Sequence, residues 1–165
     1  MRKSIIAILM TFCLSIMTYA QTPRDRATEL KEQAQSSLNQ KDYIKARYLF
    51  KKAYEAFATR ENYPQAIECG VQANALYVRE NFYKEGFELC RDMDQLIWAG
   101  EQNQKKVFYD LRFLVNKERL QMYTALKNPA QAKTQLNKLE ETANLAKNDS
   151  LTEVLLYTKA NYYYT

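Results

Sequence analysis

The sequence predicts an all-α protein built from antiparallel helix hairpins. Its 165 residues contain only three glycines and three prolines. Alanine, leucine, lysine, glutamate and glutamine, which favour helix formation, are frequent after Gln21, and no stretch alternates apolar and polar residues in the way a strand does. Short polar turns separate the predicted helices, so we expect neighbouring helices to pack antiparallel.

Residues 1–20 have the organisation of a signal peptide. Met1-Arg2-Lys3 is a short basic start, and Thr18-Tyr19-Ala20 places small residues where a signal peptidase reads them. The apolar stretch between them is too short for an uncleaved membrane anchor, the alternative interpretation, which needs roughly 20 apolar residues. We therefore expect cleavage after Ala20, export to the periplasm, and one helical domain over residues 21–165.

Polar residues and prolines mark where the first three helices begin. Thr22 is expected to cap a helix that Pro23 opens, with Asp25 near its positive end. Asp42 starts the second helix, and Asn62-Tyr63-Pro64 starts the third. The expected helices span about residues 23–39, 42–59 and 62–78.

Four more helices are expected after residue 80. Gly100 is predicted to stop the fourth helix, and Asn128-Pro129 to end the fifth and open the sixth. Ser150-Leu151-Thr152-Glu153 has the form of a capping box and is expected to start the last helix. The first three of these helices should end near residues 99, 127 and 147, and the last should still continue at Thr165.

Small and apolar residues recur where the two helices of each hairpin should cross. The first hairpin places Leu30, Ala34 and Leu38 against Tyr43, Ala46, Phe50 and Ala53; the second places Gly70, Asn74 and Tyr77 against Tyr83, Gly86, Cys90 and Met93; the third places Leu120 and Tyr123 against Pro129, Ala132, Leu136 and Leu139.

This pattern resembles the tetratricopeptide repeat family. The run from Asp42 through Ala46 and Phe50 to Ala53 matches the family pattern closely, whereas the later copies are spaced more widely than its usual period of about 34 residues. The resemblance covers about Pro23 to the end. It implies a right-handed α-solenoid of about three and a half repeats, in which the first helix of each repeat lines a concave groove for an extended peptide or a partner helix.

The residue that follows each inferred packing position should face that groove. Lys31 and Lys117 would then be able to meet a carboxylate of the ligand. The alternative is that these are ordinary solvent-exposed positions. The expected partner-binding residues are Lys31, Gln35, Val71, Ala75, Lys117, Gln121, Tyr157 and Asn161.

The last helix has the spacing of a first repeat helix without its partner. Leu156, Ala160 and Tyr163 carry this spacing, so Tyr157, Tyr162, Tyr163 and Tyr164 are expected to be unusually exposed. We expect either that residues 21–165 are the front of a longer array or that another subunit covers this end.

The residue types argue against most chemistry. The chain has no histidine, its three glycines stand singly, and its acids are spread over predicted helix faces, so we expect no catalytic site, metal site or cofactor. Removal of Arg2 and Lys3 lowers the count of Lys plus Arg from 24 to 22, against 19 acids, which leaves +3 and predicts no nucleic-acid partner. Cys69 and Cys90 could form a disulfide in an exported protein, but two buried thiols are the favoured interpretation.

The favoured function is a periplasmic scaffold that binds a protein or peptide and is not an enzyme. A leader followed by tandem hairpins also resembles the front of bacterial membrane-bound regulators, which implies a sensory role in signal transduction and membrane attachment only through a downstream segment. The alternative is a structural or assembly protein that forms a homo-oligomer through its Tyr-rich C-terminal helix.

Overall fold

The computed structural model describes residues 25–164, and these residues fold into seven helices with no strand among them. The predicted all-α class is therefore confirmed for this part of the chain. The helices are α2 (Arg26–Asn39), α3 (Tyr43–Ala58), α4 (Tyr63–Arg79), α5 (Tyr83–Gln104), α6 (Tyr109–Ala125), α7 (Pro129–Ala146) and α8 (Asp149–Tyr164).

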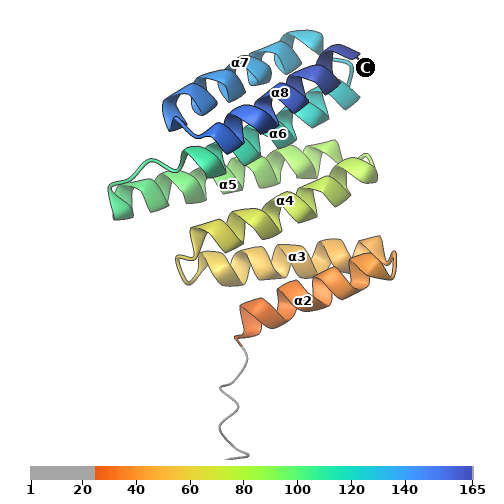
Figure 1. The fold of residues 1–165 in the computed structure, drawn as a ribbon. Helices are drawn as coiled ribbons and strands as arrows, with labels where there is room; N and C mark the ends of the chain where they lie inside the picture. The colour runs from red at the N-terminus through yellow and green to blue at the C-terminus, as the bar shows by residue number, and fades with distance from the viewer. Residues whose placement is uncertain (1–24, 165) are drawn as a thin grey trace, which may run out of the picture.

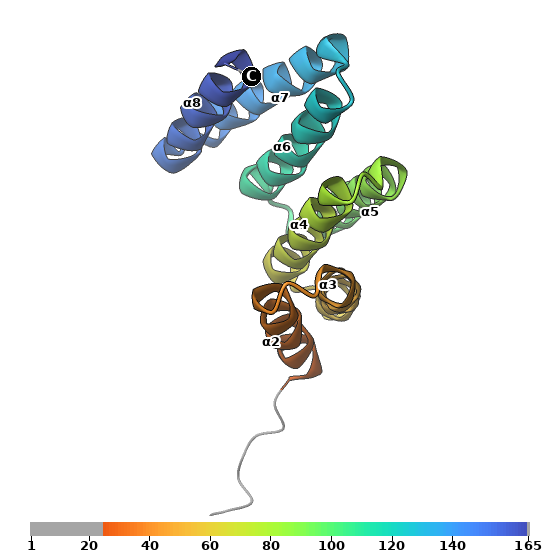
Figure 2. The same ribbon diagram turned by 90° about the vertical axis from the view of Figure 1, so that its right-hand side faces the viewer.

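Each helix runs back alongside the one before it, so the seven helices form an elongated stack (Figure 1). Seen from the side, α2 and α4 lie on one side of the stack and α3 and α5 on the other, while α6, α7 and α8 group at the far end (Figure 2). The short turns that the sequence predicted produce this antiparallel order, because a turn of a few residues leaves the chain no room to cross the stack.

Polar side chains cap several helices at the starts that the sequence predicted. The Asp42 carboxylate accepts a hydrogen bond from the backbone N–H of Lys45 at 3.2 Å, and the Asn128 side chain accepts one from Gln131 N at 3.2 Å. Pro64 and Pro129 lie in the first turns of α4 and α7, where no intrahelical N–H donor is needed.

The predicted starts of the first and last helices need comment: the first lies outside the described residues, and the last differs from the structure. The cap expected at Thr22 and the opening at Pro23 lie outside them; within them, Asp25 is itself the N-cap and accepts from Ala27 N at 3.1 Å. At the last helix, Asn148 takes the role predicted for Ser150, because its side-chain oxygen accepts the Ser150 N–H at 3.0 Å and Ser150 is already helical.

Gly100 does not stop α5, contrary to the prediction. The helix continues to Gln104 and ends at Lys105, which takes a left-handed conformation at φ 50°. Gly100 is needed instead for packing, since a Cβ atom there would lie 2.8 Å from Phe108 Cε2 and 3.0 Å from the ring of Tyr63. Glycine is found both where a helix ends and where two segments pack closely, so the glycine alone could not distinguish the two, which explains the error.

The small residues predicted at the first crossing are buried. Ala34, Ala46 and Ala53 have no exposed surface, and they belong to a core shared by α2 to α6. A second, smaller core joins α6, α7 and α8. Helix α6 is common to both, because Val115 faces the first core and Phe113 the second.

The C-terminal tyrosines follow the prediction with one exception. Tyr157, Tyr163 and Tyr164 are exposed, but Tyr162 is half-buried and packs against the smaller core. The predicted leader, residues 1–20, lies outside the described residues. Within residues 25–164, no helix combines the length and the apolar character that crossing a bilayer requires.

Candidate functional site

A groove of about 410 Å³ lies between α6 and α8, and it gathers half of the predicted partner-binding residues. Lys117 and Gln121 come from α6, and Tyr157 and Asn161 come from α8. Each pair is four residues apart, so its members lie one above the other on the same face of a helix. The complete lining is Lys117, Leu120, Gln121, Thr124, Ala125, Tyr157, Thr158, Asn161 and Tyr162.

The floor of this groove is held in place by the smaller core. Leu120 is 3% exposed and Thr158 is 8% exposed. The hydroxyls of Thr124 and Thr158 donate to backbone carbonyls one turn earlier, to Leu120 O at 2.8 Å and Val154 O at 2.7 Å. These hydroxyls are therefore already satisfied within their helices, and the polar character of the groove comes from its rim.

Lys117 gives the α6–α8 groove a positive charge. It is the only charged side chain among the lining residues. Within the described part of the chain, its side chain makes no hydrogen bond and no ion pair. The adjacent Glu118 bonds to Asn74 of α4, and its charge interacts with that of Lys117 without forming an ion pair. The groove is thus suited to a ligand that carries a carboxylate beside apolar or aromatic groups.

Amide and phenol groups complete the rim. Gln121 is exposed and Tyr157 is 71% exposed, so both are accessible to a ligand lying along the groove. Asn161 is exposed but already interacts with another residue of the chain. Side-chain amides can bond to the N–H and C=O groups of an extended peptide, and a tyrosine ring offers contact area at low entropic cost.

The other four predicted residues do not join this groove. Lys31 of α2 donates from Nζ to Gln65 Oε1 at 2.8 Å and to Glu68 Oε2 at 2.7 Å. Both acceptors belong to α4, so Lys31 links two helices of the stack and its charge is already paired. That Lys31 meets a ligand carboxylate stays a prediction, and such a ligand would have to compete with Glu68 for it.

Gln35, Val71 and Ala75 also lie away from the groove between α6 and α8. Gln35 donates to Asn39 Oδ1 of its own helix at 3.1 Å. Val71 is half-buried against the larger core, and Ala75 is exposed. Sequence spacing placed these residues on equivalent helix faces, but it could not show which neighbouring helices leave a groove between them.

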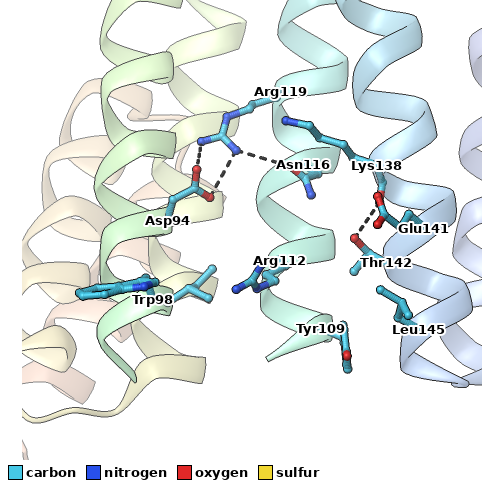
Figure 3. A pocket seen from close by; sticks show the side chains of 11 residues that line it. Asp94, Trp98, Tyr109, Arg112, Asn116, Arg119, Lys138, Glu141, Thr142 and Leu145 are labelled. Atoms are coloured by element: carbon cyan, nitrogen blue, oxygen red, sulfur yellow. Dashed lines mark hydrogen bonds and ion pairs between the residues drawn. The ribbon is translucent and has the colours of Figure 1, made fainter. Parts of the chain in front are cut away.

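A second opening, the α5–α7 cleft, lies on another side of α6 and was not predicted. Its volume is about 460 Å³. Figure 3 shows α6 as its middle wall, with Trp98 and Asp94 on α5 and Leu145 and Glu141 on α7. It is lined by Asp94, Ile97, Trp98, Tyr109, Arg112, Asn116, Arg119, Lys138, Glu141, Thr142 and Leu145.

The arginines of the α5–α7 cleft already have partners. Arg119 forms an ion pair with Asp94 and donates to the Cys90 carbonyl at 3.0 Å. Arg112 donates from Nε to Glu101 Oε1 at 2.7 Å. These hydrogen bonds from Arg112 lower the pKa of the Glu101 carboxyl, because they favour its ionised form.

Two exposed apolar side chains flank the same cleft. Trp98 is 63% exposed and Leu145 is 55% exposed, and they come from opposite walls (Figure 3). A sequence signal existed for Trp98: it is the only tryptophan of the chain and directly follows the buried Ile97, so it had to lie off the packing face. The cleft offers apolar contact, but only Lys138 adds a cation free of ion pairs within the described residues.

The two cysteines are buried, free thiols. Burial raises the pKa of the Cys69 thiol to about 11 and that of the Cys90 thiol to about 12, because a thiolate would lose its hydration. These thiols are therefore part of the core, in line with the favoured interpretation. Among residues 25–164 there is also no group of three or more acidic or cysteine side chains placed to hold a metal ion.

Comparisons with protein families, with curated proteins and with solved structures found no significant match. A function for this chain is therefore inferred from its own residues.

Proposed function

We propose that this chain is a helical-repeat scaffold that binds an extended peptide or protein segment in the α6–α8 groove. The observation that carries the proposal is the combination of Lys117, whose charge has no ion-pair partner within the described residues, with Tyr157 and Gln121 around an apolar floor. Each of these groups meets a different part of a peptide: a carboxylate, an apolar side chain and the backbone.

The finer fold in this proposal is a right-handed solenoid of tetratricopeptide-like hairpins with about three and a half repeats. Its support is the burial of Ala34, Ala46 and Ala53, the small residues at the first crossing. At the second crossing, a Cβ atom added to Gly86 would lie only 3.0 Å from Asn74 Oδ1. In such an array α8 has the position of the first helix of a repeat, and the α6–α8 groove is a segment of the inner surface.

The ligand side should present a carboxylate next to an apolar residue. The groove has one positive charge and no negative one, so an acidic side chain would be attracted and a basic one repelled. The scaffold is proposed to act by binding alone, without catalysis.

The proposed setting is the periplasm, where the domain serves as the sensory part of a membrane-bound regulator. This setting rests on the leader pattern of residues 1–20 and on the resemblance described above. Mass spectrometry of the protein recovered from the periplasm tests it, because cleavage would leave Gln21 as the first residue. An intact Met1 on the recovered protein would contradict it.

The binding proposal is tested by selecting peptides from a random display library on the purified protein and titrating one selected peptide by fluorescence anisotropy. Lys117→Ala with Tyr157→Ala should weaken binding by about tenfold or more, because buried charged and aromatic contacts dominate such interfaces. The matched control is Lys45→Ala with Tyr48→Ala, an exposed lysine and an exposed tyrosine on α3.

The control pair should leave the affinity within about twofold of the wild-type value. Equal binding by the groove variant and the wild type would refute the α6–α8 groove as the site. A selected peptide that carries lysine or arginine where a carboxylate is expected would refute the proposed ligand chemistry.

A further inference from the structure

The outer face of α8 is apolar and is not covered by the described part of the chain. Leu155 and Thr158 bury the inner face of this helix. On the opposite side Leu156, Tyr163 and Tyr164 are 63%, 61% and 92% exposed. Figure 2 shows α8 at the edge of the helix group, with its neighbours on one side only. We define the outer face of α8 as Glu153, Leu156, Ala160, Tyr163 and Tyr164.

This face carries a projection and a depression one turn apart. Leu156 projects into solvent, and Ala160, four residues later on the same side of the helix, is a small exposed residue. Close helix pairs need this combination, because a large side chain of one helix must enter a space left by a small one of the other.

The two ends of the outer face have opposite charges. Glu153 lies one turn before Leu156, and among the described residues its side chain makes no hydrogen bond and no ion pair. At the other end Lys133 of α7 donates from Nζ to the Tyr163 hydroxyl at 3.1 Å, and its Nζ is 5.6 Å from the centre of the Tyr163 ring. The face therefore begins negative and ends positive.

We propose that the outer face of α8 binds the same face of a second copy of this chain, with the two α8 helices antiparallel. When the two-fold axis passes at the level of Thr158, residue 156 of each copy faces residue 160 of the other, and residue 153 faces residue 163. Leu156 then packs onto Ala160 twice. Glu153 likewise meets the Lys133–Tyr163 pair twice, as the symmetry of such a contact requires.

A second copy fits this face because the face is complementary to itself. A parallel pair of α8 helices would place Glu153 on Glu153 and Lys133 on Lys133, whereas the antiparallel pair joins unlike charges at both ends. The helix is also held in position beforehand, because Leu155 is buried and Lys159 forms an ion pair with Glu140 of α7. Association then does not require α8 to fold or move.

Sedimentation velocity over a range of micromolar concentrations tests this proposal. The wild-type protein should show a concentration-dependent dimer. Glu153→Lys and Lys133→Glu should each weaken dimer formation by about tenfold or more, since each substitution creates two like-charge contacts. Circular dichroism checks that both variants remain helical.

Mixing the two variants gives the sharper test. In a mixed pair the lysine side chain introduced by Glu153→Lys in one copy would face the carboxylate introduced by Lys133→Glu in the other. At the second contact the unchanged Lys133 of the first copy would face the unchanged Glu153 of the second, so the mixture should form a dimer although neither variant does alone. Lys45→Glu on α3 has the same charge change as Lys133→Glu and is the control partner for the Glu153→Lys variant. The Lys45→Glu variant keeps the wild-type outer face of α8 and should dimerise with itself, so the mixed pair is followed with a fluorescent label on the Glu153→Lys protein. The labelled protein should associate with Lys45→Glu much more weakly than with Lys133→Glu, because one of the two charge contacts in that pair is repulsive.

Three results would overturn the proposal. The first is a monomeric wild-type protein at all concentrations. The second is a dimer that neither charge variant weakens. The third is equal association of the Glu153→Lys variant with the Lys133→Glu and Lys45→Glu variants, which would show attraction by net charge and not by this face.

Discussion

Asn74 of α4 donates a hydrogen bond from Nδ2 to Oε2 of Glu118 on α6 across 3.0 Å, and both side chains are buried. Glu118 is 4% exposed and Asn74 has no exposed surface. Within residues 25–164, this amide is the one hydrogen-bond donor to the carboxylate, and the Oδ1 atom of Asn74 has no hydrogen-bond partner. A buried polar contact, in which one oxygen lacks a hydrogen-bond partner, therefore joins α4 of the larger core to α6, the helix that belongs to both cores.

Burial raises the pKa of the Glu118 carboxyl above its ordinary value of 4.5, because the ionised form loses its hydration; the Asn74 hydrogen bond and the charge of Lys117 oppose this shift. Between 4.5 and the raised value, the folded state holds more protons than the unfolded state. The free energy of unfolding must then fall as the pH rises through this window.

Glu118→Gln should remove this pH dependence and raise the free energy of unfolding at pH 8 by on the order of 1 kcal/mol. Glutamine keeps an oxygen that can accept from Asn74 and carries no charge. Urea denaturation at pH 5 and pH 8 measures the difference between variant and wild type. Glu141→Gln, an exposed carboxylate of α7, is the control. A stabilisation by Glu118→Gln that is the same at both pH values would contradict the assignment.

The sequence was sufficient to predict the helices but not the contacts between hairpins. Short turns and caps such as Asp42 and Asn128 depend on residues close in the chain, so their signals are local. The α6–α8 groove and the pairing of Lys31 with Glu68 depend on which helices lie next to each other. Lys31 and Lys117 have equivalent places in the sequence pattern, although within the described residues Lys31 is ion-paired and Lys117 is not.

Gly100 shows that a glycine near a helix end can be required for close packing and not for ending the helix. Gly100→Ala should lower the free energy of unfolding by about 1–3 kcal/mol, because the added Cβ would meet Phe108 and Tyr63. These rings have little room to move, since they contact each other at 5.7 Å between centroids and Tyr63 is 2% exposed. The gain in helix propensity, about 1 kcal/mol, should not compensate.

Gly70→Ala is the comparison for this prediction. Its added Cβ would meet Met93 Sδ at 2.6 Å, and a methionine side chain can adjust more readily than a packed ring. Thermal and urea denaturation should therefore show a smaller loss for Gly70→Ala than for Gly100→Ala. A Gly100→Ala protein as stable as the wild type would mean that α5 has room at this position, and the proposed reason for the glycine would be wrong.

Lysines and other non-glycine residues end most of these helices. Lys105 and Lys147 have φ of 50°, and Lys41, Lys127, Glu61 and Asn81 are also left-handed. Glycine is preferred at such positions because a Cβ atom is strained there. The prediction assumed that a glycine would end α5 and so placed its end at Gly100, several residues before the observed end at Gln104.

Lys147→Gly should raise the free energy of unfolding by about 0.5–1 kcal/mol. Glycine relieves the strain of the left-handed conformation after α7, and the greater entropy of glycine in the unfolded chain offsets part of this gain. Lys138→Gly, an exposed position inside the same helix, should instead lower it by about 1 kcal/mol. Urea denaturation of both variants measures the two effects against the wild type. The two variants should change stability in opposite directions. Both replace a lysine by glycine and so alter charge and composition equally, but Lys138 lies inside α7 and Lys147 is the left-handed residue directly after it. A loss of stability at both positions would show that residue 147 does not hold the left-handed conformation in solution.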